Sequence, residues 1–294
     1  MPDTLAANLT ETTTELIVAT LALMPQMAPM LGLVTQKRLP KGANLLSIPR
    51  VNSTSTVQLP TEGDELVTSS QFDLTETTIS PTLRALMVRM SGRALYFSKE
   101  DVVGIVSEEL AQTQAQDIDT DLTAEFPNFG AGNDVGTTNV DLSLATLRQA
   151  RRLLRSVTRA NGGPVSGMIR CVIAPIAEEN LFTNLGVQGV VASTPPWIPT
   201  GWSQEMIATY AIPQSQLLGV SMFVDGYITE DANADVALGM FSKDALWFGI
   251  SKDWDIKTFE VPNWIGPILR SVADYNSGIG GYPLHGSYVL ADGV

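Results

Sequence analysis

The sequence predicts a mixed α+β chain in which long extended segments accompany a compact α/β region. Thr-rich, β-branched runs at Leu45–Leu59 and Leu66–Ile79 flank a short acidic turn, which indicates a long β-hairpin. Apolar residues then recur at helical spacing across Ser98–Glu125. Beyond a Gly-rich break, residues 138–251 mix short apolar strands with helical segments. Together these three observations define the predicted fold class.

The composition is unusual for a free globular protein. The 294 residues carry a formal net charge of −13, 44% of them are hydrophobic, and the mean hydropathy is +0.11. Only 17% are charged, against ~25% in typical soluble domains, so we expect a partner to cover much of the surface. Arginine outnumbers lysine twelve to six, and arginine is the cation enriched at protein interfaces. The acidic balance argues against a dedicated nucleic-acid binder, which needs a basic face.

A single cysteine and a single histidine limit the chemistry that the chain can perform. Cys171 lies in the apolar run Met168–Ile173, which predicts a buried and inert thiol. It permits no intrachain disulfide, in keeping with a reducing compartment. His285 stands among Gly, Pro and Tyr with no acid near it in sequence, so a general-base role is not expected.

The N-terminal segment contains an apolar, uncharged run at Leu16–Val34. Its length approaches the ~20 residues of a transmembrane helix. However, the residues before it are acidic, and Pro25 and Pro29 interrupt any continuous helix. We therefore expect an apolar arm that lies on another protein surface.

The predicted hairpin carries few large apolar residues, so it cannot bury a core of its own. Its tip is acidic, with Glu62, Asp64 and Glu65 around Gly63. We expect the hairpin to lie on a neighbouring subunit. A strand-like stretch at Leu83–Phe97 follows it.

The longest helix is predicted over Ser98–Glu125, where Ser98 is a suitable N-cap. Glu100 and Asp101 in its first turn complement the helix dipole. At 1.5 Å per residue it is a rod of roughly 40 Å. Its narrow apolar stripe predicts that one face of the helix packs on a sheet. The stripe consists of Val102, Val106, Leu110, Ala111, Ala115, Ile118 and Leu122.

A break at Phe126–Thr138, rich in Gly, Asn and Pro, precedes the α/β region. A second helix is expected from Asp141 or Ser143 to Ala160, with Leu144, Leu147, Leu154 and Val157 facing inward. The remaining predicted elements are strands at Met168–Ile173, Gly219–Val224, Val236–Phe241, Ala245–Ile250, Trp254–Val261 and Ile265–Tyr275, with a short helix at Pro175–Leu185. The tail from Asn276 is Gly-rich.

One acidic pattern resembles the opening of a calcium loop, namely Asp117-x-Asp119-x-Asp121. Such a loop needs Gly at its sixth position and Glu at its twelfth, where this chain has Leu122 and Asn128. The pattern also falls on a helix, where alternate residues do not share a face. It is therefore interpreted as a solvated helix face.

Other candidate motifs are also incomplete. Gly130-x-Gly132 begins like a dinucleotide-binding turn, but Val135 replaces the third glycine and no strand precedes it, so a hinge is expected. No Gly-x-Ser-x-Gly elbow occurs. Consecutive carboxylates diverge on a helix and cannot act on one bond; these pairs are Glu108/Glu109 and Glu178/Glu179. We predict that the chain is not an enzyme and that it has no catalytic, cofactor-binding or metal-ligating residues.

The second helix carries the one concentrated basic patch. Arg148, Arg152, Arg155 and Arg159 fall on one side of it, with Arg151 adjacent. No aromatic residues lie between them for base stacking. A subunit contact or salt links to carboxylates are favoured, and nucleic acid stays open as an alternative.

The order of these elements resembles the major capsid (coat) protein of tailed bacteriophages, a fold shared with herpesvirus capsid floors. Three local phrases are also similar to the family: Cys171-Val172-Ile173-Ala174-Pro175 before a helix, Leu217-Leu218-Gly219-Val220 opening a strand, and the link from Gly239 to Leu246. The resemblance covers nearly the whole chain. It implies an N-terminal arm (1–38), an extended β-hairpin loop (39–82), a peripheral domain with a long spine helix (83–137 and 252–294), and an axial α/β domain (138–251).

The resemblance implies a structural protein that self-assembles into hexamers and pentamers. These would form an icosahedral shell around the viral dsDNA genome, with only weak, non-specific contact to the DNA and no membrane. The implied location is the virion, assembled in the host bacterial cytoplasm. Because the arm starts almost at Met1, the resemblance implies a separate scaffolding protein or an extension already removed. Portal and decoration proteins are further implied partners.

Within such a shell, we expect the acidic hairpin tip to contact an arginine-bearing surface of an adjacent subunit, one that carries Arg84, Arg89 or Arg93. The Gly130–Gly136 hinge is the expected site of a domain tilt. Two other readings remain open. One is a membrane-anchored β-rich surface or binding protein that uses Leu16–Val34 as its anchor. The other is an α/β enzyme with a polar pocket in Thr138–Ser251.

Overall fold

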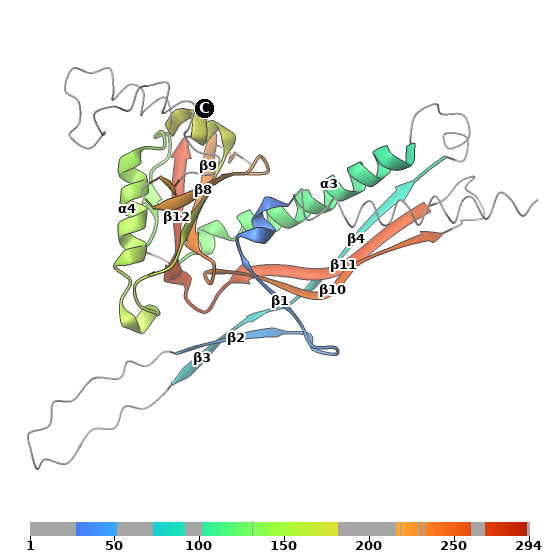
Figure 1. Cartoon of the computed structure of the whole chain (residues 1–294), viewed down its shortest axis with the longest axis horizontal. Helices are drawn as coiled ribbons and strands as arrows, with labels where there is room; N and C mark the ends of the chain where they lie inside the picture. The colour runs from blue at the N-terminus through green and yellow to red at the C-terminus, as the bar shows by residue number, and fades with distance from the viewer. Residues whose placement is uncertain are drawn as a thin grey trace, which may run out of the picture. The chain divides into compact units, whose positions relative to one another are not determined.

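The computed structural model describes residues 28–51, 73–91, 102–130, 132–181, 216–217, 219–228, 230–231, 233–259 and 268–292. The chain divides into two compact units (Figure 1). The first draws its described residues from 28–46, 79–122 and 248–277, and the second from 47–78, 123–247 and 278–292. Several predicted features lie outside the described residues: most of the apolar arm, the hairpin tip, and the helix cap at Ser98.

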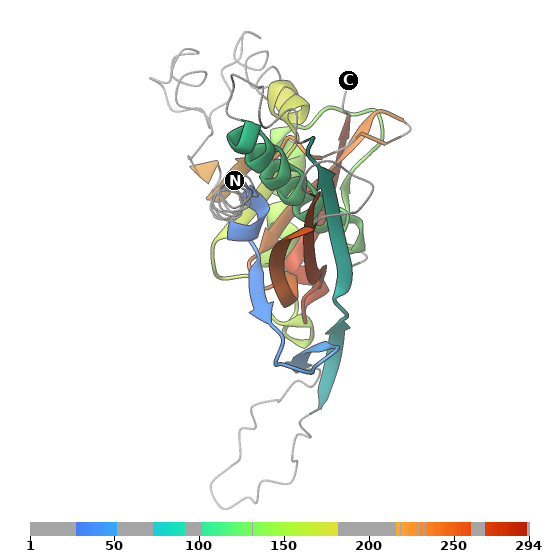
Figure 2. The ribbon, with the colours of Figure 1, turned by 90° about the vertical axis from the view of Figure 1, so that its right-hand side faces the viewer.

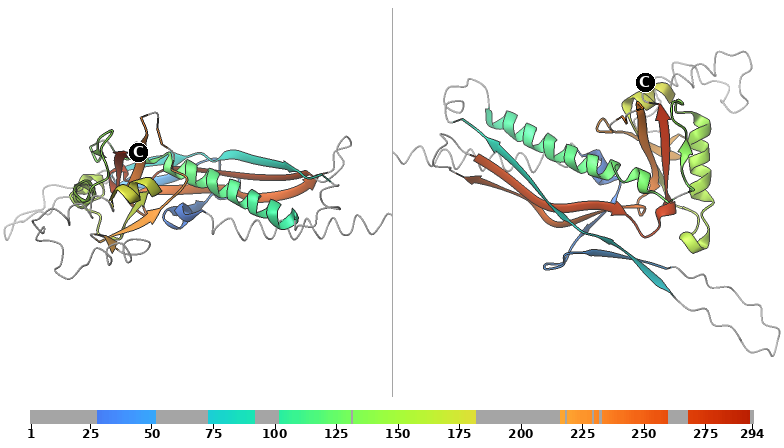
Figure 3. Two further views of the ribbon diagram at one scale, coloured as in Figure 1. Left: turned by 90° about the horizontal axis from the view of Figure 1, so that it is seen from above. Right: turned by 180° about the vertical axis from the view of Figure 1, so that it is seen from behind.

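The first unit packs one long helix, α3 (Val102–Thr123), against a sheet. The sheet has four strands in the order β1 (Thr35–Arg38), β10 (Leu246–Phe259), β11 (Ile268–Ile279) and β4 (Thr82–Arg89). Strand β11 runs antiparallel to β4, which is the edge strand. Figures 2 and 3 show the helix beside these strands.

The predicted apolar stripe explains why α3 packs on this sheet. Five of its residues are almost completely buried, namely Leu110, Ala111, Ala115, Ile118 and Leu122. Leu110 packs with Leu269 and Ile256 of the sheet. The helix ends at Thr123, four residues before Pro127, whose ring cannot be accommodated in a helix interior. The prediction of a helix with one packed face is confirmed.

The second unit centres on a six-stranded sheet. Its strands lie in the order β5 (Val135–Gly136), β12 (Gly286–Asp292), β9 (Asp235–Ser242), β6 (Ile169–Ile173), β8 (Val220–Val224) and β7 (Gln216–Leu217). Strand β6 pairs parallel with β8, whereas β9 pairs antiparallel with both β6 and β12. Residues 175–181 are helical, as predicted.

Helix α4 (Leu144–Arg155) covers this sheet through its apolar face. Ser143 caps it, because its hydroxyl oxygen accepts a hydrogen bond from the Thr146 amide at 3.2 Å. Leu147, Ala150 and Leu154 are buried against the sheet. The predicted cap and inward-facing residues are confirmed. The helix stops at Arg155 and not at Ala160, because β-branched Val157 and Thr158 follow it and lead into a 3-10 turn.

The paired strands of the predicted hairpin are present as a two-stranded sheet of β2 (Leu46–Val51) and β3 (Leu74–Ile79). The Ser47 hydroxyl donates a hydrogen bond to the Glu76 carboxylate at 2.8 Å across the pair. Residues 52–72, which include the acidic tip, lie outside the described residues.

Two predicted strands, Ala245–Ile250 and Trp254–Val261, are in fact one continuous strand, β10. The polar residues Ser251, Lys252 and Asp253, which lie between the two predicted strands, belong to the strand and have exposed side chains. Arg38 of the neighbouring β1 pairs with Asp253 at 2.8 Å, which supplies a cross-strand partner for one of them. The prediction of two strands was therefore wrong.

Strand β12 was not predicted; it lies in the Gly-rich tail beyond Asn276. Its register places Val289 opposite Leu238 of β9 and opposite Val135 of β5. The alternation of buried and half-buried residues through Ser287–Asp292 is an ordinary strand pattern. The many glycines before it obscured this signal.

The short contact between β5 and β12 requires glycine at position 136. Gly136 has a φ of +94°, and a Cβ there would lie 2.0 Å from the Leu290 carbonyl oxygen. Gly132 has a similar φ of +98°, but a Cβ there would meet nothing within 4 Å. Substitutions at the two positions therefore distinguish the effect of backbone strain from that of steric overlap.

We predict that Gly136→Ala destabilises the protein more than Gly132→Ala. Both variants should lose about 1 kcal/mol of unfolding free energy, because an L side chain is strained at positive φ. Gly136→Ala should lose about 2 kcal/mol more, because β5 and β12 must move apart. Urea denaturation measures both, and equal losses would contradict the close approach.

Candidate functional site

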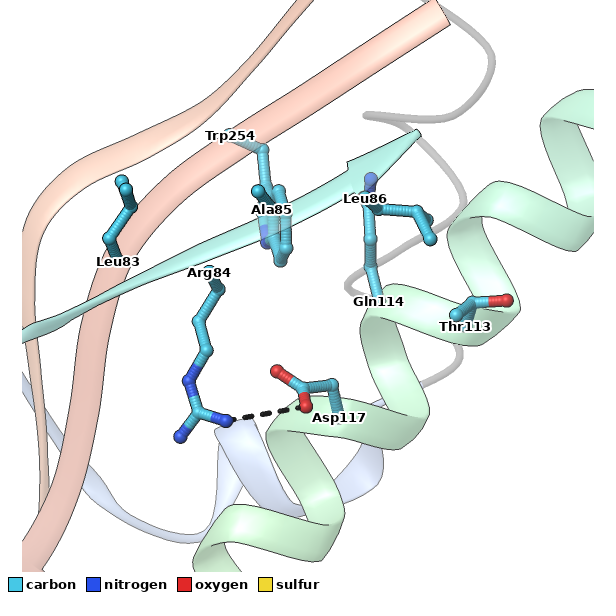
Figure 4. A pocket seen from close by; sticks show the side chains of 8 residues that line it. All are labelled: Leu83, Arg84, Ala85, Leu86, Thr113, Gln114, Asp117 and Trp254. Carbon is cyan, nitrogen blue, oxygen red and sulfur yellow. Dashed lines mark ion pairs between the residues drawn. The ribbon is translucent and has the colours of Figure 1, made fainter. Parts of the chain in front are cut away.

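The helix and sheet of the first unit are joined by a network of polar side chains. Arg84 of β4 donates a hydrogen bond through Nη2 to Asp121 Oδ1 at 2.7 Å, and its Nη1 lies 3.5 Å from Asp117 Oδ1 (Figure 4). The Tyr275 hydroxyl donates to Asp117 Oδ2. The Arg84 guanidinium also lies 5.5 Å from the centre of the Tyr275 ring. Three elements, α3, β4 and β11, thus contribute to one cluster.

Asp121 is held from a second side by β11. Its Oδ2 accepts a hydrogen bond from the Ser277 amide at 3.0 Å, and its backbone oxygen accepts one from the Ser277 hydroxyl at 2.9 Å. The Asp121 side chain is only 18% exposed, and Asp119 is completely buried. The interpretation of this acidic pattern as a solvated helix face was therefore wrong for these two residues. The strands beneath the helix bring a cation that sequence spacing did not reveal.

The surroundings of the cluster favour a charged Arg84 and a neutral Tyr275. Burial alone lowers the pKa of Arg84, but the carboxylates of Asp121 and Asp117 outweigh it and leave this pKa raised. Burial raises the pKa of Tyr275, and its hydrogen bond to Asp117 raises it further. Arg84 is thus a fixed cation and Tyr275 a neutral donor. Arg84 is engaged inside its own subunit, which removes it from the arginines expected to contact the hairpin tip.

A pocket of about 230 Å³ opens beside this cluster, between β4 and α3 (Figure 4). It is lined by Leu83, Arg84, Ala85, Leu86, Thr113, Gln114, Asp117 and Trp254. Gln114 is 1% exposed and donates through Nε2 to Ser271 Oγ at 2.8 Å. The pocket is smaller than the ~300–1,000 Å³ of ordinary ligand sites. It also lies outside Thr138–Ser251, where the enzyme alternative placed its polar pocket.

The other face of edge strand β4 is apolar and exposed. Leu83 is 70% and Met87 54% exposed; with Ala85 between them, they occupy alternate positions on one side of the strand. They lie opposite Asp274 and Arg270 of β11. Exposed apolar side chains on an edge strand are a ready contact surface for another chain.

Cys171 and His285 have structural roles. Cys171 is completely buried in β6, as predicted, and burial raises the pKa of its thiol to about 12. The Nε2 atom of His285 lies 3.1 Å from the Gly163 carbonyl oxygen, and its ring lies 5.1 Å from that of Tyr282. Burial lowers the pKa of His285, and Asp244 opposes this shift, so an acid does lie near it in space.

The remaining sequence candidates stay apart. Glu108 and Glu109 are exposed on α3, and Glu179 is exposed beside half-buried Glu178. Burial raises the pKa of Glu178. Among the described residues, no group of three His, Cys, Asp or Glu side chains is placed to hold a metal ion.

The glycine segment predicted as a hinge contacts the chain's tail. The Gly130 amide donates to the Pro283 carbonyl at 3.3 Å, and Asn133 Nδ2 donates to the carbonyls of Leu284 and Gly286. The Ser287 hydroxyl donates to the Asn133 carbonyl at 2.5 Å. The domain tilt expected here stays a prediction.

One arginine of the predicted stripe on α4 contacts the backbone beyond the helix. Arg155 donates through Nη1 to the Val165 carbonyl at 2.6 Å, so it ties the helix end to the turn before β6. Arg155 is nevertheless exposed, as are Arg148, Arg152 and Arg159. In the part of the chain that the structure describes, no helix is both long and apolar enough to cross a membrane. Most of Leu16–Val34 lies outside that part.

Comparison with solved structures identifies the fold of this chain. No family model matches the sequence, and no curated protein is similar to it. Among solved structures, the capsid of cyanophage P-SCSP1u matches with a TM-score of 0.66 and 13% identity, covering 89% of this chain and 87% of that one. The mature capsid of bacteriophage PhiM1 matches with a TM-score of 0.61 and 18% identity, covering 88% and 85%. This chain has the phage major capsid fold.

The same capsid fold extends beyond phages. The holo-SrpI encapsulin complex from Synechococcus elongatus matches with a TM-score of 0.58 and 7% identity, covering 90% of this chain and 86% of that one. Because coverage is high in both directions, the capsid fold accounts for nearly the whole chain. The fold class predicted from the order of elements is confirmed.

Replacing Tyr275 tests the polar network of the capsid fold. We predict that Tyr275→Phe lowers the unfolding free energy by about 1 kcal/mol, because it removes the hydrogen bond to Asp117 while the ring keeps its contacts. Tyr282→Phe is the control, since the Tyr282 hydroxyl makes no hydrogen bond to the described residues. Chemical denaturation measures both variants. Equal effects would show that the hydroxyl of Tyr275 contributes nothing.

The same hydroxyl predicts a loss of stability at alkaline pH. The pKa of Tyr275 is raised in the folded state above its ordinary value near 10, so the unfolded state loses this proton first. Its contribution is complete below pH 10 and falls as the pH rises further, by up to about 1.4 kcal/mol per pH unit. Wild-type stability should therefore fall more steeply than that of Tyr275→Phe above pH 10. Parallel curves would contradict the raised pKa.

Proposed function

We propose that this chain is a structural protein that self-assembles into hexamers and pentamers, which form an icosahedral shell around a dsDNA genome. The observation that carries the proposal is the match of nearly the full chain to phage capsids in both directions. The likeness covers 89% of this chain and 87% of the P-SCSP1u capsid chain. The proposal makes the chain a component of the virion, assembled in the host cytoplasm, and not an enzyme.

The surface properties support assembly. The low charge content and near-neutral mean hydropathy are costly for a free monomer but suit a subunit covered by neighbours. Exposed apolar side chains on strands supply contact area; they include Leu45, Leu74, Leu83 and Met87. The membrane-anchored alternative has no observation in its favour.

Within the shell, we retain the division into an arm (1–38), an extended loop (39–82), a peripheral domain (83–137 and 252–294) and an axial domain (138–251) as a proposal. The pairing of β12 with β9 favours moving residues 278–292 to the axial domain. Beyond itself, the proposed partners are a separate scaffolding protein, a portal and decoration proteins. Contact with packaged DNA would be weak and non-specific.

Assembly is the direct test. We expect the purified chain, co-expressed with a scaffolding protein where one is needed, to elute as rings or closed particles. Light scattering after size-exclusion chromatography and electron microscopy would measure their mass and symmetry. Nuclease-protected DNA in particles from infected cells would identify the cargo. A chain that stays monomeric at high concentration under all these conditions would refute the proposal.

The acidic tip of the extended loop is proposed to contact an arginine-bearing surface of an adjacent subunit, one that carries Arg89 or Arg93. We predict that Glu62→Lys, Asp64→Lys and Glu65→Lys together abolish assembly, because like charges would then face each other. The matched control reverses Glu108, Glu109 and Glu179, which are exposed elsewhere. Particle yield measures the effect, and normal particles from the tip variant would exclude this contact.

A further inference from the structure

The pocket between β4 and α3 combines apolar walls with hydrogen-bond acceptors. Ala85 and Leu86 of β4 supply aliphatic surface, and Trp254 of β10 supplies an indole ring (Figure 4). Asp117 and Gln114 line it from α3. A few polar groups that converge on a mostly apolar cavity are typical of a ligand site.

Asp117 has hydrogen-bonding capacity to spare. An ionised carboxylate accepts about four hydrogen bonds. Its Oδ2 accepts one from the Tyr275 hydroxyl, and its Oδ1 lies 3.5 Å from Arg84 Nη1, which is longer than a charge-assisted hydrogen bond. The Asp117 side chain is 42% exposed, so a ligand can reach it. Asp121, in contrast, is 18% exposed and is engaged by Arg84 and by the Ser277 amide.

Gln114 offers a second acceptor, independent of the carboxylates. Its side chain extends from α3 toward β4 (Figure 4) and is almost completely buried. The Nε2 atom donates to Ser271 Oγ, but the buried Oε1 atom accepts no hydrogen bond from the residues that the structure describes. A buried amide oxygen without a donor is destabilising, and a ligand that donates a hydrogen bond to it would remove this cost.

The charges around the pocket favour a cation over an anion. The polar cluster beside it holds two carboxylates, those of Asp117 and Asp121, against the single guanidinium of Arg84. The net charge of −13 attracts cations to the chain at longer range. An aromatic ring such as that of Trp254 also attracts a cation placed over its face. An anion would meet Asp117 as a like charge.

We propose that this pocket binds the ammonium group of an aliphatic primary amine. An ammonium group has three N–H donors, which can serve the Asp117 carboxylate and the Gln114 oxygen together. The carbon chain of the amine then packs against Leu86 and Trp254. An apolar cavity of about 150 Å³ holds benzene. A pocket of about 230 Å³ therefore has room for a short amine such as n-butylammonium.

The ligand class is tested on the full chain by ligand-detected NMR titration with n-butylammonium, butanol and butyrate. The three probes are similar in length and differ in charge. We expect n-butylammonium to bind at least about fivefold more tightly than butanol, because only the ammonium forms a charge-assisted hydrogen bond. Butyrate should not bind. Equal affinities for the amine and the alcohol, or a preference for butyrate, would overturn the proposal.

Two variants and a matched control test the residues. Asp117→Asn should weaken n-butylammonium binding about fivefold, because it removes the charge with little change of shape. Trp254→Leu should weaken it about threefold, because the aromatic face is lost. Glu108→Gln makes the same charge change as Asp117→Asn at an exposed position of the same helix outside the pocket, and should bind as wild type.

Circular dichroism and the thermal unfolding midpoint show whether each variant is folded. If Asp117→Asn does not fold, Trp254→Leu and the probe series still decide. Wild-type affinity in the folded pocket variants, or an equal loss in Glu108→Gln, would overturn the proposal. Particle formation enters none of these measurements, so this inference and the proposed shell function stand or fall separately.

The same ammonium group occurs in free amines and at the end of a lysine side chain, and a final titration distinguishes these two sources. The probe is a lysine whose α-amino and carboxyl groups are both blocked as amides. Tighter binding than that of n-butylammonium would support the site with a lysine of another protein as its ligand. Weaker binding would support it with a free amine. Absence of binding by both probes would overturn the proposal.

Discussion

The packing of α3 on its sheet depends on burying charge together with its countercharge. A helix with an apolar stripe this narrow leaves acidic residues close to the sheet, and a buried carboxylate without a cation is strongly destabilising. Arg84 meets two carboxylates at once, and Tyr275 supplies a neutral donor beneath them. Phe248 and Trp254 pack on the Tyr275 ring, with ring centres 5.2 Å and 5.6 Å away. The register of β4 against β11 is therefore specified by polar as well as apolar contacts.

The difference between local and long-range interactions explains how much of the fold could be predicted from the sequence. Periodic apolar residues identified both long helices, and the Ser143 cap was found because capping is local. The burial of Asp121 was missed because its partner is 37 residues away, on a strand whose pairing no local pattern reveals. Strand β12 was missed for a related reason, since its evidence is the register with β9 and not its own glycine-rich composition.

The same difference applies to the candidate surfaces. The basic character of α4 was evident from sequence, because charge is a property of composition. The contact of Arg155 with the Val165 carbonyl was not, since it depends on the turn that follows the helix. The exposed apolar pair on β4 was equally hidden, because alternation along a strand does not say which side a helix will cover.

The position of Cys171 has a practical consequence. It is the sole cysteine of the chain, it is completely buried in β6, and its thiol has a pKa raised to about 12. At neutral pH almost none of it is thiolate, the form that reacts with alkylating reagents. A cysteine introduced at any exposed position would therefore be the only reactive thiol. The natural chain is already a suitable background for site-specific dyes, crosslinkers or displayed cargo, and alkylation of Cys171 itself would report when the sheet opens.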